Sequence, residues 1–324
     1  MKRRDVLALA AASVGGVVAG AGTGPAAWAA PAPLTVPGDT FHPESITAAP
    51  NGDLYVASIV TGEIVRFPAR TRVAETFVPA GVNLGTAGIL VDPLRRVLWA
   101  CAIDLSFQTP TELRAFDLAT GALVASYTVP DRGVCADLAI AYGAVYVTDT
   151  TDPTADPRLP GRILRLVTPD PCRATGGALT VWSADPAFTS GPGGLQVNGI
   201  AFDGRATFYT TNYSTGQLIR VGLRRDGSPT AATEIPLATP FVNPDGIRML
   251  DRTHLLVTEN PGRLSLVDVT TAEVTLVTGA VDQPTSVVRV GRYLWVAEGQ
   301  VLRLQTGQPP NLPFTIRPVP VPAV

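Results

Sequence analysis

The sequence predicts an all-β fold, a six-bladed β-propeller with a central channel, and three observations support this prediction. Short runs of Val, Ile, Leu, Tyr and Trp are punctuated by turn residues, with 31 Gly and 30 Pro among 324 residues, which is typical of all-β proteins. A short sequence phrase, in which a small residue and then an aliphatic residue follow a position that is often polar, begins each of six repeats. The repeats have a period of roughly 40 to 60 residues, the spacing of propeller blades. With 46% hydrophobic and 16% charged residues, the chain can bury a large core.

The first copy of the phrase shows the predicted strands. It runs Ile46-Thr47-Ala48, turns at 50–53, returns as Leu54-Tyr55-Val56-Ala57, turns at Thr61-Gly62 and continues to Phe67. A β-sandwich is the alternative, but it would not repeat one polar-small-aliphatic phrase at the head of each unit. The segments 31–41 and 314–319 are both strand-capable, and we expect one of them to close the ring. Residues 151–161 are rich in Pro and Asp and predict a loop over one face.

Residues 1–29 predict an export signal. Lys2, Arg3 and Arg4 precede an Ala/Gly/Val run that ends in Ala27-Trp28-Ala29, the order of a charged region, an apolar region and a cleavage site. The paired arginines indicate the twin-arginine type, with an ordinary secretory signal as the alternative. We therefore expect residues 30–324 to form one propeller domain, exported to the periplasm or the exterior. No later apolar run is long enough to span a bilayer.

Charge excludes several classes of function. Residues 1–29 hold three basic residues and one acidic residue, so 22 basic and 26 acidic residues remain after their removal, and nucleic acid is not an expected partner. Lys2 is the only lysine, which excludes a Schiff-base or phosphate-loop lysine from the exported domain.

The histidines and cysteines do not predict a metal site. His42 and His254 lack the spacing of metal ligands, and we expect His42 in a surface turn. Cys101 and Cys135 could form a disulfide or remain buried thiols.

The repeat also predicts a site in the channel. The first strand of each blade lines the channel, so equivalent positions form a ring at one depth. Aligning the six copies on their aliphatic residue gives the ring Glu44, Ala87, Ala136, Asn198, Asp245 and Thr285. Three of these side chains offer carboxylate or amide oxygens, and oxygen ligands without nitrogen or sulfur suit calcium better than zinc, with magnesium or manganese as alternatives. We therefore predict that Glu44, Asn198 and Asp245 hold a divalent metal.

Polar residues also end the second strands, which return antiparallel to the same face as the ring. We predict that they form the walls of a pocket above the metal, where fixed polar groups orient a small ligand. The alternative for each residue is a solvated loop position. The predicted substrate-binding residues are Asp149, Asn212, Glu259 and Glu298, with Asn260 beside them.

The phrases Pro43-Glu44-Ser45-Ile46, Asn198-Gly199-Ile200 and Pro244-Asp245-Gly246-Ile247 resemble the SMP-30/gluconolactonase/LRE family, whose wider relatives include paraoxonase and diisopropylfluorophosphatase. The resemblance covers nearly the whole chain after residue 29. It implies a six-bladed propeller whose channel holds a divalent metal, usually calcium, through a Glu, two Asn and an Asp. Glu44, Asn198 and Asp245 match three of these ligands. The fourth position departs from the family, because this chain has Ala136 in Cys135-Ala136-Asp137, and we expect the side chain of Asp137 to point away from the channel in a regular strand.

Two functions follow as expectations. The first is a metal-dependent hydrolase of small lactones or related esters, in which Asp245 is the residue most central to catalysis. The second is a binding module with a weakened metal site, since fold does not fix function. A lyase or a synthase-like relative with the same ring is a third, less favoured reading. The sequence does not specify the substrate or the oligomeric state.

Overall fold

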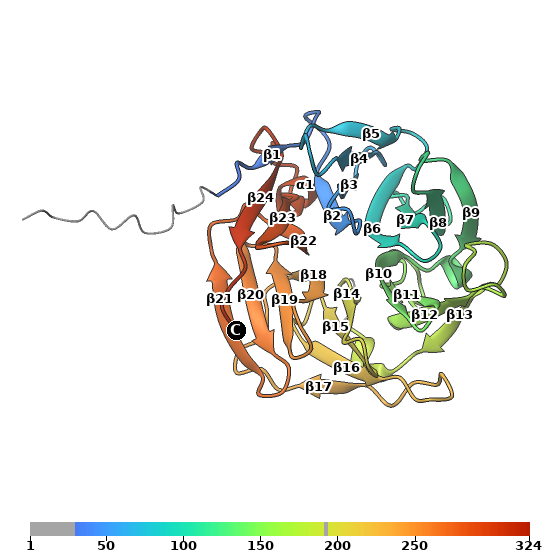
Figure 1. Cartoon of the computed structure of the whole chain (residues 1–324). Helices are drawn as coiled ribbons and strands as arrows, with labels where there is room; N and C mark the ends of the chain where they lie inside the picture. Colours follow the sequence, from blue (N-terminus) through green and yellow to red (C-terminus); the bar gives the residue numbers. More distant parts are fainter. Residues whose placement is uncertain (1–29, 191–193) are drawn as a thin grey trace, which may run out of the picture. The chain divides into compact units, whose positions relative to one another are not determined.

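The structure is a computed structural model that describes residues 30–190 and 194–324. Pro31–Val324 form one unit, in which six four-stranded antiparallel sheets surround a central channel as blades (Figure 1). The first strands of neighbouring blades contact one another around the whole ring, so the six-bladed propeller predicted from the repeats is confirmed. The predicted export signal lies outside the described residues.

The strands follow the repeats in order. Blade one has β2 (Pro43–Ala48), β3 (Leu54–Ser58), β4 (Ile64–Phe67) and β5 (Glu75–Val78), and blade two has β6 (Gly85–Asp92), β7 (Val97–Ile103), β8 (Glu112–Asp117) and β9 (Leu123–Thr128). Blade three has β10 (Cys135–Ala141), β11 (Ala144–Asp149), β12 (Arg162–Val167) and β13 (Leu179–Ser183), and blade four has β14 (Val197–Phe202), β15 (Thr207–Asn212), β16 (Leu218–Gly222) and β17 (Thr233–Ile235). Blade five has β18 (Pro244–Met249), β19 (His254–Glu259), β20 (Arg263–Asp268) and β21 (Glu273–Thr278). Blade six has β22 (Pro284–Val290), β23 (Tyr293–Glu298), β24 (Thr315–Pro320) and β1 (Leu34–Thr35).

Both strand-capable terminal segments close the ring. β1 pairs antiparallel with β24, with Leu34 opposite Ile316 and Thr35 opposite Thr315, and it forms the outer strand of blade six. The amide of Val36 extends this pairing by donating to the carbonyl of Phe314 at 2.9 Å. The sequence led us to expect one closing segment. The structure uses both, because an outer strand from the start of the chain completes a sheet begun near its end.

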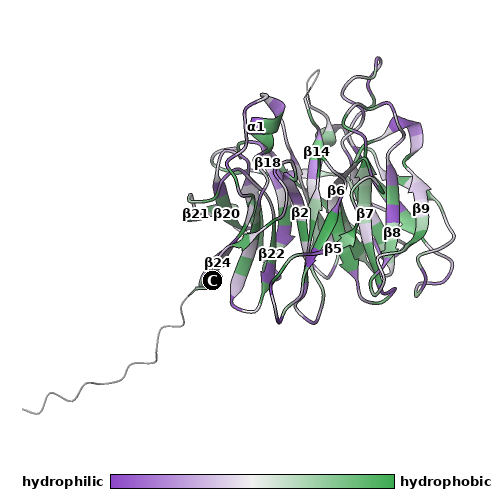
Figure 2. Ribbon diagram, turned by 90° about the horizontal axis from the view of Figure 1, so that it is seen from above, coloured by the Kyte–Doolittle hydropathy of each residue, from purple (hydrophilic) through white to green (hydrophobic). Residues whose placement is uncertain are grey.

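Helices are few in this fold. α1 (Val301–Gln305) lies between β23 and β24, and short 3₁₀ turns lie at Pro130–Arg132 and Pro186–Phe188. Within the described residues no helix is long and apolar enough to cross a membrane. Residues 151–161 form the predicted loop between β11 and β12, and Figure 2 shows that hydrophobic ribbon is concentrated in the strands.

The core lies between blades rather than within them. The described residues contain six buried hydrophobic clusters, and each takes all or nearly all of its side chains from two neighbouring blades. Between blades one and two, for example, Tyr55 and Ile64 pack with Ile89, Leu98 and Phe116. A sheet that is apolar on both faces must be covered on both faces. Each blade therefore depends on its two neighbours.

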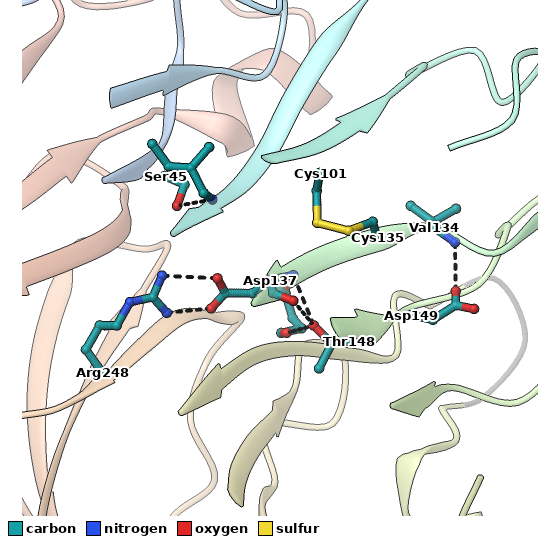
Figure 3. Close-up of a disulfide and its surroundings, with 10 residues drawn as sticks. Ser45, Cys101, Val134, Cys135, Asp137, Thr148, Asp149 and Arg248 are labelled. Carbon is teal, nitrogen blue, oxygen red and sulfur yellow. Dashed lines mark hydrogen bonds and ion pairs between the residues drawn. A yellow bond between two sulfur atoms is a disulfide. The ribbon is translucent and has the colours of Figure 1, made fainter. Parts of the chain in front are cut away.

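A disulfide crosses one of these interfaces. Cys101 on β7 and Cys135 on β10 are bonded, which joins blades two and three across 34 residues of sequence (Figure 3). The sequence allowed either this disulfide or two buried thiols, and the structure contains the disulfide. Cys172 is an exposed free cysteine.

We expect Cys101→Ser/Cys135→Ser to lower the free energy of unfolding by about 2–4 kcal/mol, because the crosslink restricts the unfolded chain. Unfolding should nevertheless remain a single transition, since no blade has a core of its own. Calorimetry and chemical denaturation measure both quantities, and Cys172→Ser is the matched control with little expected effect. Two well-separated transitions in the parent protein would contradict the interdependence of the blades.

Candidate functional site

A register irregularity interrupts the first strand of every blade at the same point. In blade one Pro43 pairs with Ser58 and Ser45 with Ala57, which leaves Glu44 as an extra residue in its strand. The equivalent irregularity occurs in the other five blades. A β-bulge of this kind breaks the alternation of side chains along a strand. One or two consecutive positions of each first strand therefore line the channel.

The predicted ring residues meet at these bulges. Five of the six, all except Ala87, line a cavity of about 10 Å³, which is room for one water molecule or one ion. The structure therefore brings together the three side chains predicted to bind metal. Ring positions in the lining are Glu44, Ala136, Asn198, Asp245 and Thr285, and the next positions are Ser45, Gly88, Asp137, Gly246 and Ser286.

The small residue of each phrase is required by the next blade. A Cβ atom on Gly199 would lie 2.3 Å from the carbonyl oxygen of Asp245, and one on Gly246 would lie 2.6 Å from that of Thr285. Ser45 occupies the equivalent position in blade one, and its hydroxyl accepts a hydrogen bond from the amide of Ile89 at 3.1 Å. The phrase repeats a small residue at this position because neighbouring first strands approach one another closely around the channel.

Two amide side chains hold the carboxylate of Asp245. Asn198 Nδ2 donates to Oδ1 at 2.9 Å, and Asn260 Nδ2 donates to Oδ2 at 2.9 Å. Asn260 is buried and is itself fixed by the hydroxyl of Tyr213, which donates to its Oδ1 at 2.6 Å. Asn260, which we expected in a pocket wall, therefore orients Asp245. Asp245 is the most constrained side chain of the ring.

Glu44 has the opposite environment. Its carboxylate receives no hydrogen bond from the described part of the chain, and burial, followed by the charges of Asp245 and Asp137, raises its pKa well above the usual value. Burial also raises the pKa of Asp245 to about 7, although the bonds from Asn260 and Asn198 lower it. Both shifts have the same cause: ionised carboxylates in the channel repel one another and lack solvent.

Asp137 and Arg248 form an ion pair across the channel, which the sequence did not predict. Arg248 Nη1 donates to Asp137 Oδ2 at 2.7 Å and Nη2 donates to Oδ1 at 3.1 Å, linking blades five and three (Figure 3). The expectation that Asp137 points away from the channel is wrong. It assumed a regular strand, whereas the bulge between Cys135 and Leu138 turns this side chain inward.

The charges in the channel do not balance. Glu44, Asp137 and Asp245 supply three carboxylates, and Arg248 supplies one guanidinium that attracts both Asp137 and Glu44. One divalent cation would neutralise the remaining two charges. The donors fit such an ion, because two carboxylates and an amide oxygen form a hard ligand set and Glu44 has no other partner. No group of three or more His, Cys, Asp or Glu side chains suited to a metal occurs in residues 30–190 and 194–324, so the set depends on Asn198.

The four predicted substrate-binding residues lie elsewhere. Asp149, Asn212, Glu259 and Glu298 are buried at equivalent ends of the second strands, and none of them lines the small cavity. Three of them accept a hydrogen bond from the backbone amide just before the first strand of the same blade: Val134 to Asp149, Val242 to Glu259 and Asp282 to Glu298. Each of these three also faces an arginine, namely Arg162, Arg263 and Arg317. These bonds give them a role in holding each blade together, and contact with substrate stays a prediction.

His42 is buried, which corrects its expected place on the surface. Its Nδ1 lies 2.9 Å from the carbonyl oxygen of Gly299, and its ring lies against Phe314 with centroids 4.6 Å apart. Burial lowers its pKa, against the hydrogen bond to Gly299. A histidine next to a strand that begins a blade is drawn inward here because the closing segments of blade six pack against it.

α1 follows β23, whose last residue pairs with the first residue of β22, so the helix lies on the side of the propeller where the first strands begin. Leu304 packs against the hydrophobic cluster that contains Ile59 of blade one and residues of blades two and three, and Gln305 lies close to Tyr213 of blade four. Blade six thus contacts other blades through this helix. Burial, then the charge of Asp245, raises the pKa of Tyr213, so its hydroxyl remains a donor to Asn260.

We expect Arg248→Met to destabilise the protein by about 3–5 kcal/mol, because it leaves the buried carboxylate of Asp137 without its partner. Arg248→Met/Asp137→Asn should recover part of this loss, since residue 137 then carries no unpaired charge. Arg263→Met is the control: Arg263 is half exposed and 3.6 Å from Glu259, so its loss should cost about 1 kcal/mol or less. Urea denaturation of the four proteins measures the differences.

Ala136→Asn should tighten calcium binding by about tenfold, or 1.4 kcal/mol. Ala136 lines the channel cavity together with Glu44 and Asn198, so an amide oxygen at this position would add a ligand. Titration calorimetry with calcium measures the affinity. Thr285→Asn tests the opposite side of the ring, and equal affinity in the parent and Ala136→Asn would mean that this position does not reach the ion.

Comparison with known proteins supports the fold. Neither a protein family profile nor a curated protein sequence matches the chain. Among solved structures it is similar to a gluconolactonase from Xanthomonas campestris, at 16% identity and a TM-score of 0.64 over 90% of this chain and 88% of that one. It is also similar to the calcium-binding protein regucalcin from Agrobacterium tumefaciens, at 17% identity and 0.61 over 91% and 98%. A luciferin-regenerating enzyme matches at 14% identity and 0.61 over 83% and 88%. These three structures are of the kind that the sequence resemblance indicated.

Proposed function

We propose that this protein is a divalent-metal-dependent hydrolase of small lactones or related esters, and that calcium is its preferred ion. The observation that carries the proposal is the meeting of Glu44, Asn198 and Asp245 in one cavity, with the carboxylate of Glu44 unpartnered by the described residues. A buried carboxylate without donors is costly, and a hard cation is the partner that oxygen ligands of this kind select.

The proposed roles of the side chains follow from their contacts. Bound in the ring, a divalent cation would polarise a carbonyl oxygen and lower the pKa of a water molecule. Asp245 is held by Asn198 and Asn260 on its two oxygens, and each oxygen keeps a lone pair that can accept a hydrogen bond from the attacking water. The cavity of about 10 Å³ is too small for a lactone, so substrate would bind on the mouth side of the ring, near α1.

The structural neighbours support this choice of reaction. One is named a gluconolactonase and another a calcium-binding regucalcin. Identities of 16% and 17% carry the fold, and the activity proposed for this chain rests on its own ring residues. Asp149, Asn212, Glu259 and Glu298 remain candidates for substrate contact through local movement of the strand ends.

A non-catalytic binding module is the second candidate, and one observation favours it. Ala136 stands where the resembling family places a further ligand, and the adjacent Asp137 is already paired with Arg248. Both features reduce the number of oxygens left for an ion. Metal content after purification, followed by a colour assay for lactone opening, distinguishes the candidates: an enzyme retains metal and opens lactones, whereas a binding module does not open them.

The location of the protein is a further part of the proposal. We infer export to the periplasm or the exterior from residues 1–29, and the Cys101–Cys135 disulfide supports it because such bonds persist in oxidising compartments.

Asp245→Asn should lower turnover by roughly 10² or more with metal at saturation, because it removes the charge that accepts a hydrogen bond from water while keeping the size of the side chain. Glu44→Gln should mainly weaken metal binding, and excess metal should restore part of the activity. Steady-state kinetics across a metal titration separate the two effects. Full activity in metal-saturated Asp245→Asn would refute the role of Asp245, and a parent that opens no lactone would favour the binding module.

A further inference from the structure

A second pocket lies at the opposite end of blades three and four from the ring. Ala136 is at the start of β10, whereas this pocket is lined by Tyr142, which follows the last residue of β10, and by the turns after β14 and β16. Its volume is about 530 Å³, within the size of small-molecule sites. Its lining includes Tyr142, Tyr146, Arg165, Arg205, Arg224 and Arg225.

Four guanidinium groups at one pocket are unexpected in this chain. After residue 29 acidic residues outnumber basic ones, yet one carboxylate, Asp226, is present among these lining residues. Oδ1 of Asp226 accepts hydrogen bonds from the amide and the hydroxyl of Ser228, at 2.9 and 2.7 Å, and Arg224 is the one lining arginine whose charge acts on this carboxylate. Across residues 30–190 and 194–324, none of the four arginines is within ion-pair distance of a carboxylate. The pocket therefore carries uncompensated positive charge.

Arg165 is the fixed member of this group. It projects from β12 over the ring of Tyr146, with its guanidinium carbon 5.8 Å from the ring centroid. Its Nε is buried and has no hydrogen-bond partner, and Nη1 makes a long contact of 3.4 Å with the carbonyl oxygen of Gly227. Arg165 lines the pocket with its guanidinium held against an aromatic ring, and among the described residues its Nη2 makes no hydrogen bond, so this nitrogen is available to an external acceptor.

The aromatic side chains define the rest of the ligand. The side chain of Tyr142 is 75% exposed at the rim, and its hydroxyl is tied to the carbonyl of Arg205, so its ring is presented in one orientation. Arginine donors match the oxygens of phosphate and sulfate in paired hydrogen bonds, and an exposed ring offers a face for stacking. The pocket thus combines an anion site with an apolar surface.

We propose that this pocket binds a small organic oxyanion, a phosphate or sulfate ester, with Arg165 and its neighbours on the anionic group and Tyr142 against the organic part. The site is separate from the channel and does not depend on the proposed hydrolase function. Phosphate and sulfate esters share the chemistry that the pocket recognises, and their relative affinities identify the source of the natural ligand.

Titration calorimetry of the protein with phenyl phosphate, phenyl sulfate and phenol tests the proposal. We expect one saturable site for at least one ester, none for phenol, and an affinity that falls as salt is raised. Arg165→Gln should weaken binding by about tenfold or more, and Arg225→Gln by several-fold, because each removes charge-assisted donors. Arg70→Gln, an exposed arginine in blade one, is the matched control and should bind as the parent does.

Arg225 is exposed, so its variant remains informative if Arg165→Gln is poorly folded. Tighter binding of the phosphate ester than of the sulfate ester would identify a phosphorylated ligand, and the reverse order a sulfated one. Absence of binding by both esters at millimolar concentration would overturn the proposal. So would equal affinity in the parent, Arg225→Gln and Arg70→Gln, since binding would then be a non-specific property of the surface.

Discussion

The packing of each blade against its neighbours is the constraint on which the rest of this structure depends. Strands such as β3 and β7 are buried along their whole length, so both faces of a blade must be covered. Only a closed ring covers every face, and closure requires that β1 from the start of the described chain joins β24 from its end. The channel and its side chains exist because of this closure.

The close approach of first strands around the channel also shapes the site. Gly88, Gly199 and Gly246 lie where a Cβ atom would meet the backbone of the next blade, and a bulge interrupts the strand beside each of them. The same geometry that packs the ring therefore concentrates polar groups at its axis. Glu44, Asp245 and Asp137 come within electrostatic reach of one another for this reason.

Charge in the channel is balanced only in part by the protein. Arg248 neutralises Asp137 through two hydrogen bonds, and Asp245 is stabilised by amide donors from Asn198 and Asn260. Glu44 receives no hydrogen bond from the described residues, and only the charge of Arg248 stabilises its ionised form. The distribution of donors thus leaves one side of the ring for an external cation, while the other sides are fixed by the protein itself. An ion site of this kind combines one carboxylate that hydrogen bonds hold in place, Asp245, with a second that is free to coordinate the ion, Glu44.

The sequence by itself determined the number of blades, the identity of their strands and the ring that contains Glu44, Asn198 and Asp245, because the two-residue period of strands and the six repeats are local properties of the chain. The tertiary structure alone decided the inward turn of Asp137, since a bulge is not visible in an alternating pattern. It also decided the pairing of Asp137 with Arg248, which are 111 residues apart, and the Cys101–Cys135 disulfide. The burial of His42 likewise depends on the carbonyl of Gly299 and the ring of Phe314, and the anchoring of Asp149 and Glu259 within their blades depends on the backbone amides that donate to them. These contacts join residues distant in sequence, and no local pattern specifies which of several polar groups will meet.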